Sequence, residues 1–281
     1  MKIIEFTNKD FANFFNKREP DSHKYDYGSF LFVAGSLGMT GALRLCLEAS
    51  LVSGAGLVYY LAPSFHFSYY DMLSVEAIAI KRKDLDEKIS KCHTVCIGSG
   101  LKVNRVNTLL LERVLAQAKN KVVCDGGALR MLADKERLLK KYGSKMILLP
   151  HHGEMSGLCK MSVEQIKKDR IRTAYDFYSS YGAITVLKGH KSLVVGEEGI
   201  YVCEKGNPGM ATPGSGDVLA GMVTAYSNLK TSDFNKLASA VYMHALAGDI
   251  ASQEYGKISL KASDIVNNIH KAHKEVLGDK A

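Results

Sequence analysis

The alternation of short apolar runs with longer segments of helical periodicity constrains the fold of this chain more than any other feature. Five segments each contain a predicted strand that ends in a polar or glycine-rich loop: SFLFVAGS (29–36), AGLVYYLAP (55–63), HTVCIGSG (93–100), KVVCDGGALRML (121–132) and SKMILLPHHGEM (144–155). The intervening segments 42–54 and 104–120 have the apolar spacing of helices. This alternation predicts an α/β fold, in which a mainly parallel sheet is covered by helices on both faces.

The second half of the chain has a different pattern. A long helix is predicted over 163–182, and three short β segments (183–189, 191–196 and 199–206) are predicted to form a local antiparallel hairpin. Two or three helices follow, from 217–226 to 263–273. Because the 281 residues contain neither a long linker nor an internal repeat, the chain is predicted to be a single domain over residues 1–281.

Charge and composition exclude several classes of partner. The net charge of +8 is spread along the chain without a basic tail, so nucleic acid is not expected as a partner, whereas an anionic small molecule is compatible with it. No apolar run approaches the length of a membrane span, and the N-terminus has no signal-peptide core, so we expect a cytoplasmic protein that binds no membrane. Cys46, Cys96 and Cys124 lie in apolar segments and are expected to be reduced core thiols.

Ligands of such sheets bind at the carboxyl ends of the strands. Five loops are therefore expected to lie along one edge of the sheet: 35–42, 98–101, 125–128, 150–155 and 206–217. None of them contains the phosphate-binding pattern GxxxxGK[ST] or the dinucleotide fingerprint GxGxxG. A prediction of function must therefore depend on another pattern.

The last of these loops, GNPGMATPGSGD (206–217), runs directly into an apolar helical segment. Gly214 and Gly216 lack the Cβ atoms that would keep a phosphate away from the backbone, and a helix N-terminus offers unpaired N–H groups to an anion. Asp217 in the first turn would repel that phosphate, unless it accepts a proton from an attacking hydroxyl or holds a metal ion. The pattern indicates phosphoryl transfer; an ordinary helix cap after a glycine-rich loop is the alternative.

Together with the residues up to Gly221, this loop resembles the signature of the ADP/ATP-dependent NAD(P)H-hydrate dehydratases, which have the ribokinase-like fold. Further segments match the family in the same order: Ser22-His-Lys24 with Gly28, Ala34-Gly-Ser36, Gly41-Ala42, Gly54-Ala-Gly-Leu-Val58, Gly98-Ser-Gly-Leu101, Asp125 with Ala128-Leu129, Pro150-His151 with Gly153-Glu-Met155, and Lys188-Gly189. The resemblance covers about residues 22 to 270. Because it begins so near the first residue, the separate epimerase domain of some family members is not expected.

The resemblance implies that the ring hydroxyl of hydrated NADH or NADPH is phosphorylated by ADP or ATP with Mg²⁺, and that phosphate is then expelled. Asp217 would be the general base, and the N–H groups of the Gly214–Gly216 segment would stabilise the transferred phosphoryl group. By family position, the dinucleotide-binding residues would be Ala42, Gly100, His151 and Asp217. The nucleotide-binding residues would be Lys188, Gly189, His190, Lys191, Ser192, Gly214 and Gly216. A homo-oligomer, such as a tetramer, is also expected.

Four residues of these segments have structural alternatives. His151 could cap or brace its loop, Lys188 could be a surface cation rather than a phosphate contact, and Asp125 could cap the turn that follows it. Glu154 could be an exposed loop acid. In a kinase-like site it would instead order water around Mg²⁺, which keeps several of its waters, so its expected metal contact is indirect.

The chain also departs from the family pattern. Gly127 stands where the family often has a second acid, and His152 stands where proline commonly follows the loop histidine. Pro213 and Ser215 replace a frequent Gly and Thr, and Tyr25 replaces a common Gly. These differences leave the predicted base and anion site in place but allow an altered nucleotide or substrate preference.

Two other functions share parts of this pattern. A small-molecule kinase of the same fold, of the hydroxymethylpyrimidine or hydroxyethylthiazole type, would share the Gly-Asp loop but need not share the Pro-His-x-Gly-Glu-Met segment at 150–155. A non-catalytic nucleotide sensor would retain the fold, but it would gain nothing from Asp217 beside a phosphate. The choices between ADP and ATP and between the two hydrates stay open, although stand-alone bacterial members of the family favour ADP.

Overall fold

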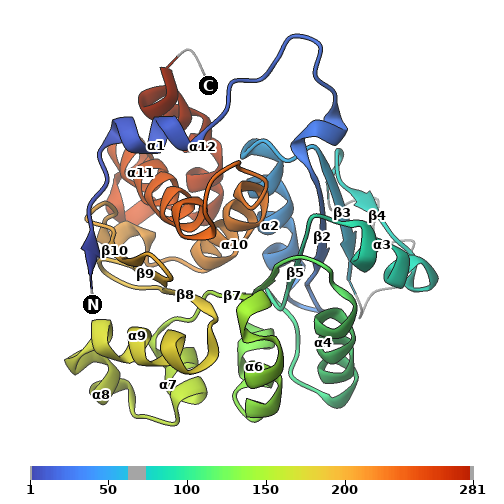
Figure 1. Cartoon of the computed structure of the whole chain (residues 1–281). Helices are drawn as coiled ribbons and strands as arrows, with labels where there is room; N and C mark the ends of the chain where they lie inside the picture. Colours follow the sequence, from blue (N-terminus) through green and yellow to red (C-terminus); the bar gives the residue numbers. More distant parts are fainter. Residues whose placement is uncertain (1, 63–73, 279–281) are drawn as a thin grey trace.

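The computed structural model describes residues 2–62 and 74–278, and its strands join in one central sheet (Figure 1). The order across the sheet is β1-β10-β9-β8-β7-β6-β5-β2-β3-β4. The strands are β1 (Ile3–Ile4), β2 (Ser29–Val33), β3 (Leu57–Leu61), β4 (Ile78–Ala79), β5 (Thr94–Ile97), β6 (Val122–Cys124), β7 (Met146–Leu148), β8 (Ile184–Leu187), β9 (Leu193–Gly196) and β10 (Gly199–Val202).

The sheet is mainly parallel, as predicted. Strand β9 runs antiparallel to its neighbours β8 and β10, which confirms the predicted local hairpin, and the other neighbouring pairs are parallel. The carboxyl ends of β2, β5, β6, β7, β8 and β10 therefore lie along the same edge of the sheet. The five loops that were predicted to share an edge follow β2, β5, β6, β7 and β10, so their predicted arrangement is confirmed.

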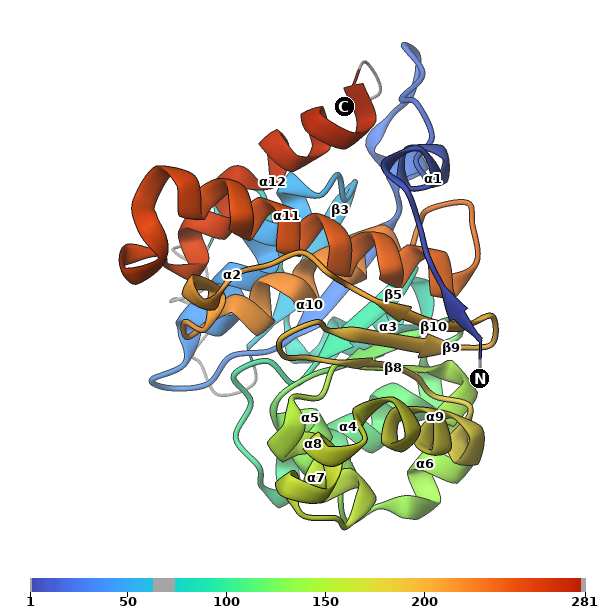
Figure 2. The same ribbon diagram turned by 90° about the vertical axis from the view of Figure 1, so that its left-hand side faces the viewer.

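Helices cover both faces of the sheet (Figure 2). One layer contains α1 (Asn8–Phe14), α2 (Thr40–Val52), α10 (Ser215–Tyr226), α11 (Asp233–Ser259) and α12 (Ala262–Leu277). The other contains α3 (Leu85–Lys91), α4 (Arg105–Gln117), α5 (Gly127–Leu132), α6 (Glu136–Tyr142), α7 (His152–Cys159), α8 (Val163–Lys168) and α9 (Arg170–Tyr181). No helix in the described ranges combines the length and the apolar character needed to cross a membrane.

Strand β2 shows why the sheet needs both layers. Phe30 and Phe32 pack into the core beneath α2, α10 and α11, whereas Leu31 and Val33 pack into the core of the opposite layer. Side chains alternate between the two faces of a strand, so a strand that is apolar at every position must be buried on both sides. The four side chains are fully buried, which matches the continuous apolar run in the sequence.

The cysteine prediction is confirmed. Cys46 on α2, Cys96 on β5 and Cys124 on β6 are buried and form no disulfide. Burial raises the pKa of each thiol well above its ordinary value, so these side chains behave as small apolar core residues.

The prediction of one long helix over 163–182 is wrong in one respect, because this segment forms two helices. Helix α8 ends at Lys168, and Asp169 has φ −147° and ψ 77°, which is not helical backbone. The Asp169 carboxylate accepts a hydrogen bond from the Arg172 N–H and so begins α9. A short polar side chain that caps a new helix explains a break that apolar periodicity alone does not reveal.

Some predicted boundaries also shift. The strand predicted over 55–63 is β3 at Leu57–Leu61, and Pro63 lies outside the described residues. The predicted loops 125–128 and 150–155 are shorter than expected, because α5 begins at Gly127 and α7 begins at His152. Both loops therefore present the first turn of a helix to the carboxyl edge of the sheet.

Candidate active site

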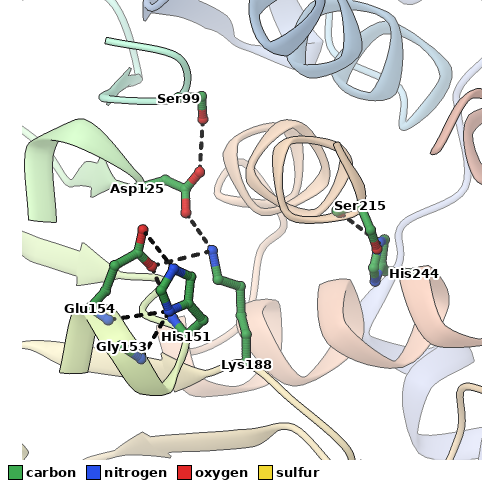
Figure 3. Close-up of polar contacts among 8 residues, drawn as sticks. All are labelled: Ser99, Asp125, His151, Gly153, Glu154, Lys188, Ser215 and His244. Atoms are coloured by element: carbon green, nitrogen blue, oxygen red, sulfur yellow. Dashed lines mark hydrogen bonds and ion pairs between the residues drawn. The ribbon is translucent and has the colours of Figure 1, made fainter. Parts of the chain in front are cut away.

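Three charged side chains from neighbouring strand ends meet at the carboxyl edge of the sheet (Figure 3). Asp125 follows β6, Lys188 follows β8, and Glu154 lies in the first turn of α7 after β7. The Lys188 Nζ lies 2.6 Å from Asp125 Oδ1 and 3.9 Å from Glu154 Oε2. Ser99, in the loop after β5, donates a hydrogen bond to Asp125 Oδ2 at 2.9 Å. Both acids are buried, with exposed fractions of 4%, and the lysine is partly buried, at 17%.

The start of α10 lies beside this cluster. Gly214 caps the helix with φ +94°, a conformation that favours glycine, and an added Cβ would lie 2.4 Å from Leu45 Cδ1. A Cβ on Gly216 would lie 3.2 Å from Lys188 Nζ, so the ammonium group is close to the first turn of the helix. Asp217 lies in that turn, as predicted. The N-terminus of α10, the Lys188 ammonium and the Asp217 carboxylate therefore lie close together.

The electrostatics of this cluster keep one acid near its titration point at neutral pH. Burial raises the pKa of Asp217 from 3.8 to about 7, and the nearby Asp125 charge adds to this rise. The Lys188 charge and the nearby Ser99 hydroxyl oppose it. Burial also raises the pKa of Glu154, against the effect of Lys188. Three carboxyl groups thus share one ammonium group, a charge imbalance typical of functional sites.

Lys188 remains a cation in this environment. Burial by itself would lower the pKa of the amine, but the charges of Asp125, Glu154 and Asp217 raise it above its ordinary value. The alternative that Lys188 is a surface cation is therefore wrong, because the side chain is only 17% exposed and is paired with Asp125. A partly buried ammonium at a helix N-terminus suits the phosphate contact that the resemblance implies, and that contact stays a prediction.

His151 and Glu154 form a reciprocal cap for α7. His151 Nδ1 accepts hydrogen bonds from the N–H groups of Gly153 (3.0 Å) and Glu154 (3.2 Å), and Glu154 Oε2 accepts one from the His151 N–H at 3.0 Å. The structural alternative for His151 is thus correct, and Glu154 is not an exposed acid. The imidazole is still 54% exposed, so its predicted contact with a dinucleotide stays a prediction.

Ala42 and Gly100 lie against each other where α2 and the loop after β5 meet. A Cβ on Gly100 would lie 2.9 Å from the Ala42 Cβ and 2.8 Å from the Met39 carbonyl oxygen. The Ser36 hydroxyl donates a hydrogen bond to the Gly100 carbonyl at 2.7 Å. The two loops are therefore packed backbone to backbone, although their predicted contact with substrate stays a prediction.

The other predicted nucleotide-binding residues form the turn between β8 and β9: Gly189, His190, Lys191 and Ser192. The Arg170 guanidinium donates to the carbonyl oxygens of His190 (2.6 Å) and Lys191 (3.1 Å). The Ser192 hydroxyl donates to the Gly189 carbonyl at 3.0 Å. This turn directly follows Lys188 at the carboxyl edge, and its nucleotide contact stays a prediction.

The first residue of α10, Ser215, also contacts His244 of α11. His244 Nε2 lies 3.0 Å from the Ser215 carbonyl oxygen and 3.5 Å from its hydroxyl (Figure 3). Burial lowers the pKa of His244 to about 4, so the ring is neutral at neutral pH and must carry its proton on Nε2 to donate to the carbonyl. No local sequence pattern indicates this contact, because the two residues are 29 positions apart.

The charged residues do not form a metal centre of their own. Within residues 2–62 and 74–278, no group of three or more His, Cys, Asp or Glu side chains is arranged to hold an ion. The Lys188 ammonium already lies between Asp125 and Glu154. These residues do not fit a directly chelated Mg²⁺, and an indirect contact of Glu154 through water stays a prediction.

Two residues of the cluster were missed or misread in the sequence. Ser99 was not predicted to belong to the site, and Asp125 was considered only as a cap for the turn after it. The Asp125 side chain instead binds Ser99 and Lys188. Both residues follow strands that end at the carboxyl edge, and that position is the sequence signal that identifies them as candidates.

The fold is that of ribokinase-like proteins. It superposes on a ribokinase-like superfamily protein from Enterococcus faecalis V583 with a TM-score of 0.88 at 24% identity, covering 98% of this chain and 96% of that one. The TM-score is 0.82, at 23% identity, with the ADP/ATP-dependent NAD(P)H-hydrate dehydratase from Bacillus subtilis co-crystallized with ATP/Mg²⁺, covering 96% and 97%. The predicted ribokinase-like fold is confirmed.

Sequence comparison narrows this class to one family. A family model described as NAD(P)H-hydrate dehydratase matches residues 30–271. The chain is 32% identical over 250 residues to the ADP-dependent (S)-NAD(P)H-hydrate dehydratase of Neisseria meningitidis serogroup B, covering 88% of this chain and 84% of that protein. It therefore belongs to the NAD(P)H-hydrate dehydratase family. It spans about half the length of the bifunctional NAD(P)H-hydrate repair enzymes that it also matches, such as that of Moorella thermoacetica.

Proposed function

We propose that this chain restores NADH or NADPH from the hydrated cofactor, at the expense of ADP or ATP. The observation that carries the proposal is the position of Asp217, whose pKa is raised to about 7, at the start of α10 beside the Lys188 ammonium. A base with a pKa near the working pH is suited to take a proton from a hydroxyl. Membership of the dehydratase family supports the same reaction.

In the first step, Asp217 accepts the proton of the ring hydroxyl while the hydroxyl oxygen attacks the terminal phosphorus of the nucleotide. The bond from that phosphorus to its bridging oxygen breaks, and AMP leaves if ADP is the donor, or ADP if ATP is the donor. The N–H groups at Gly214–Gly216 and the Lys188 ammonium stabilise the charge on the transferred phosphoryl group.

In the second step, the phosphorylated ring loses phosphate. The lone pair of the ring nitrogen expels the phosphate from the adjacent carbon, so that the carbon–oxygen bond breaks and the phosphate keeps the bonding electrons. The next ring carbon then gives a proton to water or to the departing phosphate, and the double bond is restored. Since the nitrogen supplies the driving force, no second strong base is needed, which agrees with one carboxylate, Asp217, in the catalytic position.

The predicted binding residues divide between the two ligands. We propose that Ala42, Gly100 and His151 contact the dinucleotide and that the turn after Lys188, residues 189–192, contacts the nucleotide. Mg²⁺ is proposed to arrive with the nucleotide phosphates and to keep most of its water, because the charged residues do not fit an ion chelated by the protein.

We also propose a homo-oligomer, such as a tetramer, that works in the cytoplasm. Light scattering on the purified protein measures its mass in solution. A mass equal to that of one chain, 30.8 kDa, would contradict the oligomer but not the reaction.

The reaction is tested by incubating purified protein with hydrated NADH or NADPH, Mg²⁺ and either ADP or ATP. The expected result is recovery of the absorbance of the reduced nicotinamide and release of inorganic phosphate in equal amounts. A small-molecule kinase would instead accumulate a stable phosphorylated product. Mass spectrometry that finds a phosphorylated thiazole or pyrimidine, without cofactor repair, would assign the function to that alternative.

A further inference from the structure

Asp125 is not among the proposed ligand-binding residues and its only part in the chemistry so far is the effect of its charge on the pKa of Asp217, yet both of its carboxylate oxygens are held. Oδ1 lies 2.6 Å from the Lys188 ammonium, and Oδ2 accepts a hydrogen bond from the Ser99 hydroxyl at 2.9 Å. The side chain is only 4% exposed. Its orientation is therefore fixed by groups on the loops after β5 and β8, which flank β6 and β7 in the sheet.

The position of the Lys188 ammonium depends on this carboxylate more than on any other contact of the amine. Glu154 is its second anionic neighbour, but Glu154 Oε2 lies at 3.9 Å, beyond hydrogen-bond distance, and accepts from the His151 N–H instead. A lysine side chain has a flexible four-carbon stem, so without Asp125 the ammonium would be free to move toward Asp217 or Glu154. The contact at Asp125 keeps it next to Gly216 at the start of α10.

A purely stabilising role explains this pair poorly. Taking both charges out of water is costly, and a buried ion pair often contributes no more to stability than apolar residues of the same volume. The pair also lies where a phosphate would meet the helix N-terminus rather than between packed core elements. A fixed ammonium at that point costs no reorganisation when charge develops on a transferred phosphoryl group.

We infer that Asp125 is a positioning residue, which holds Lys188 so that its ammonium faces the phosphoryl group at the start of α10. Ser99 completes the arrangement by fixing the second oxygen of the carboxylate. The inference deepens the proposed function and rests on it. Beside the direct effect of its charge on the pKa of Asp217, it assigns to Asp125 an effect that acts through Lys188, so removing either partner should have largely the same consequence for ADP affinity.

A double-mutant cycle tests this dependence. We compare Asp125→Asn, Lys188→Met and the double variant by kcat/KM for the hydrated cofactor, and by the Kd for ADP from calorimetry. Each single variant should lose about tenfold or more in kcat/KM and bind ADP more weakly. The double variant should be no worse than Lys188→Met alone, within about threefold.

The matched control is Asp134→Asn, which removes an exposed carboxylate that lies 2.8 Å from the Lys160 ammonium. It should leave both constants unchanged and should combine additively with Lys188→Met. Melting curves accompany each variant, since a merely structural Asp125 would lower the melting temperature of Asp125→Asn but leave ADP affinity intact below it. Additive losses in the cycle, or unchanged ADP affinity in Asp125→Asn, would overturn the inference.

Two precautions keep the test decisive. If Lys188→Met does not fold, ADP affinity and kcat of Asp125→Asn alone give the answer, because unchanged values contradict a positioning role. If the unmodified protein repairs no hydrate, the proposed function fails, but the ADP affinities of the variants still show whether Asp125 acts through Lys188. The two failures are therefore distinguishable.

Discussion

Lysines and acids cluster at both edges of the central sheet. Acids outnumber lysines in the cluster at the carboxyl edge, and lysines outnumber acids in the cluster at the amino edge. At the carboxyl edge, one ammonium, Lys188, faces the carboxyl groups of Asp125, Glu154 and Asp217. At the amino edge, before β5 and β6, the ammonium groups of Lys121 and Lys236 each lie 3.0 Å from the single carboxylate of Asp233. The latter group lines a cavity of about 380 Å³ with further lysines.

The pKa values of the acids at the two edges, Asp217 and Asp233, are shifted in opposite directions. Burial and a nearby like charge raise the pKa of Asp217 to about 7. Burial also acts to raise the pKa of Asp233, but hydrogen bonds from Lys236 and Lys121 outweigh it and lower the pKa below its ordinary value. An acid with too few cations can exchange protons near neutral pH, whereas an acid with two stays ionised and stabilises the fold. Both regions contain charged side chains, and they differ in the ratio of carboxylates to ammonium groups.

The largest expected effect comes from removing the acid at the carboxyl edge. Asp217→Asn keeps the size and most hydrogen bonding of the side chain but cannot accept the proton, so kcat should fall on the order of 10²–10⁴-fold. Binding of ADP, measured by calorimetry, should persist. Asp233→Asn is the matched control at the other edge and should leave kcat unchanged. Near-normal turnover by Asp217→Asn would contradict the role of Asp217 as the catalytic base at the carboxyl edge.

A second, smaller effect is expected at the start of α10. In Gly216→Val the new Cβ meets only the end of the flexible Lys188 side chain, at 3.2 Å, so the fold should tolerate it. The added side chain would occupy the place of a phosphate, and ADP affinity should fall by about tenfold or more, which corresponds to about 1.4 kcal/mol.

The matched control for this change is Gly157→Val on α7, where an added Cβ would make an ordinary contact with Ala133 at 3.4 Å. Its ADP affinity should not change. Equal affinities in Gly216→Val and the unmodified protein would mean that the glycine-rich loop is an ordinary helix cap.

The smallest expected effect concerns the amino edge. Asp233→Asn should reduce the free energy of unfolding at pH 7 by about 0.5–1 kcal/mol, as for other partly exposed ion pairs. Because the folded pKa is depressed below 3.8, this stabilisation is present above the unfolded pKa and is lost as the pH falls through the folded value. Denaturant unfolding at pH 7 and in acid should show the difference shrinking in acid; a constant difference would contradict the ionic role of Asp233.

Much of the carboxyl edge could be predicted because its signals are local. Each loop follows an apolar run, and the Gly214–Asp217 pattern marks a helix start within a few residues. The ion pair between Asp125 and Lys188 could not be predicted in this way, since the partners are 63 residues apart and come together only through the strand order. The same holds for β1, where Ile3 pairs with Ile200.

The departures from the family pattern find only partial explanations. An added Cβ on Gly127 would lie 2.2 Å from the Leu101 carbonyl oxygen, so this chain has no space for a second acid there without a backbone shift. His152 lies against Gly189, where an added Cβ would be 2.8 Å from the imidazole Cε1. Nothing in the structure explains Tyr25, whose side chain is exposed.

The central claim is that burial, together with the excess of carboxyl groups at the carboxyl edge, raises the pKa of Asp217 so that it acts as a base near neutral pH. The most direct measurement is the pH dependence of kcat/KM for hydrated NADH with ADP, because this ratio reports the ionisation of the free enzyme. Asp217 must be ionised to accept the proton, so the rate should rise with pH along a limb whose apparent pKa is about 7. A limb below pH 5, near the ordinary value of a carboxyl group, would contradict the account.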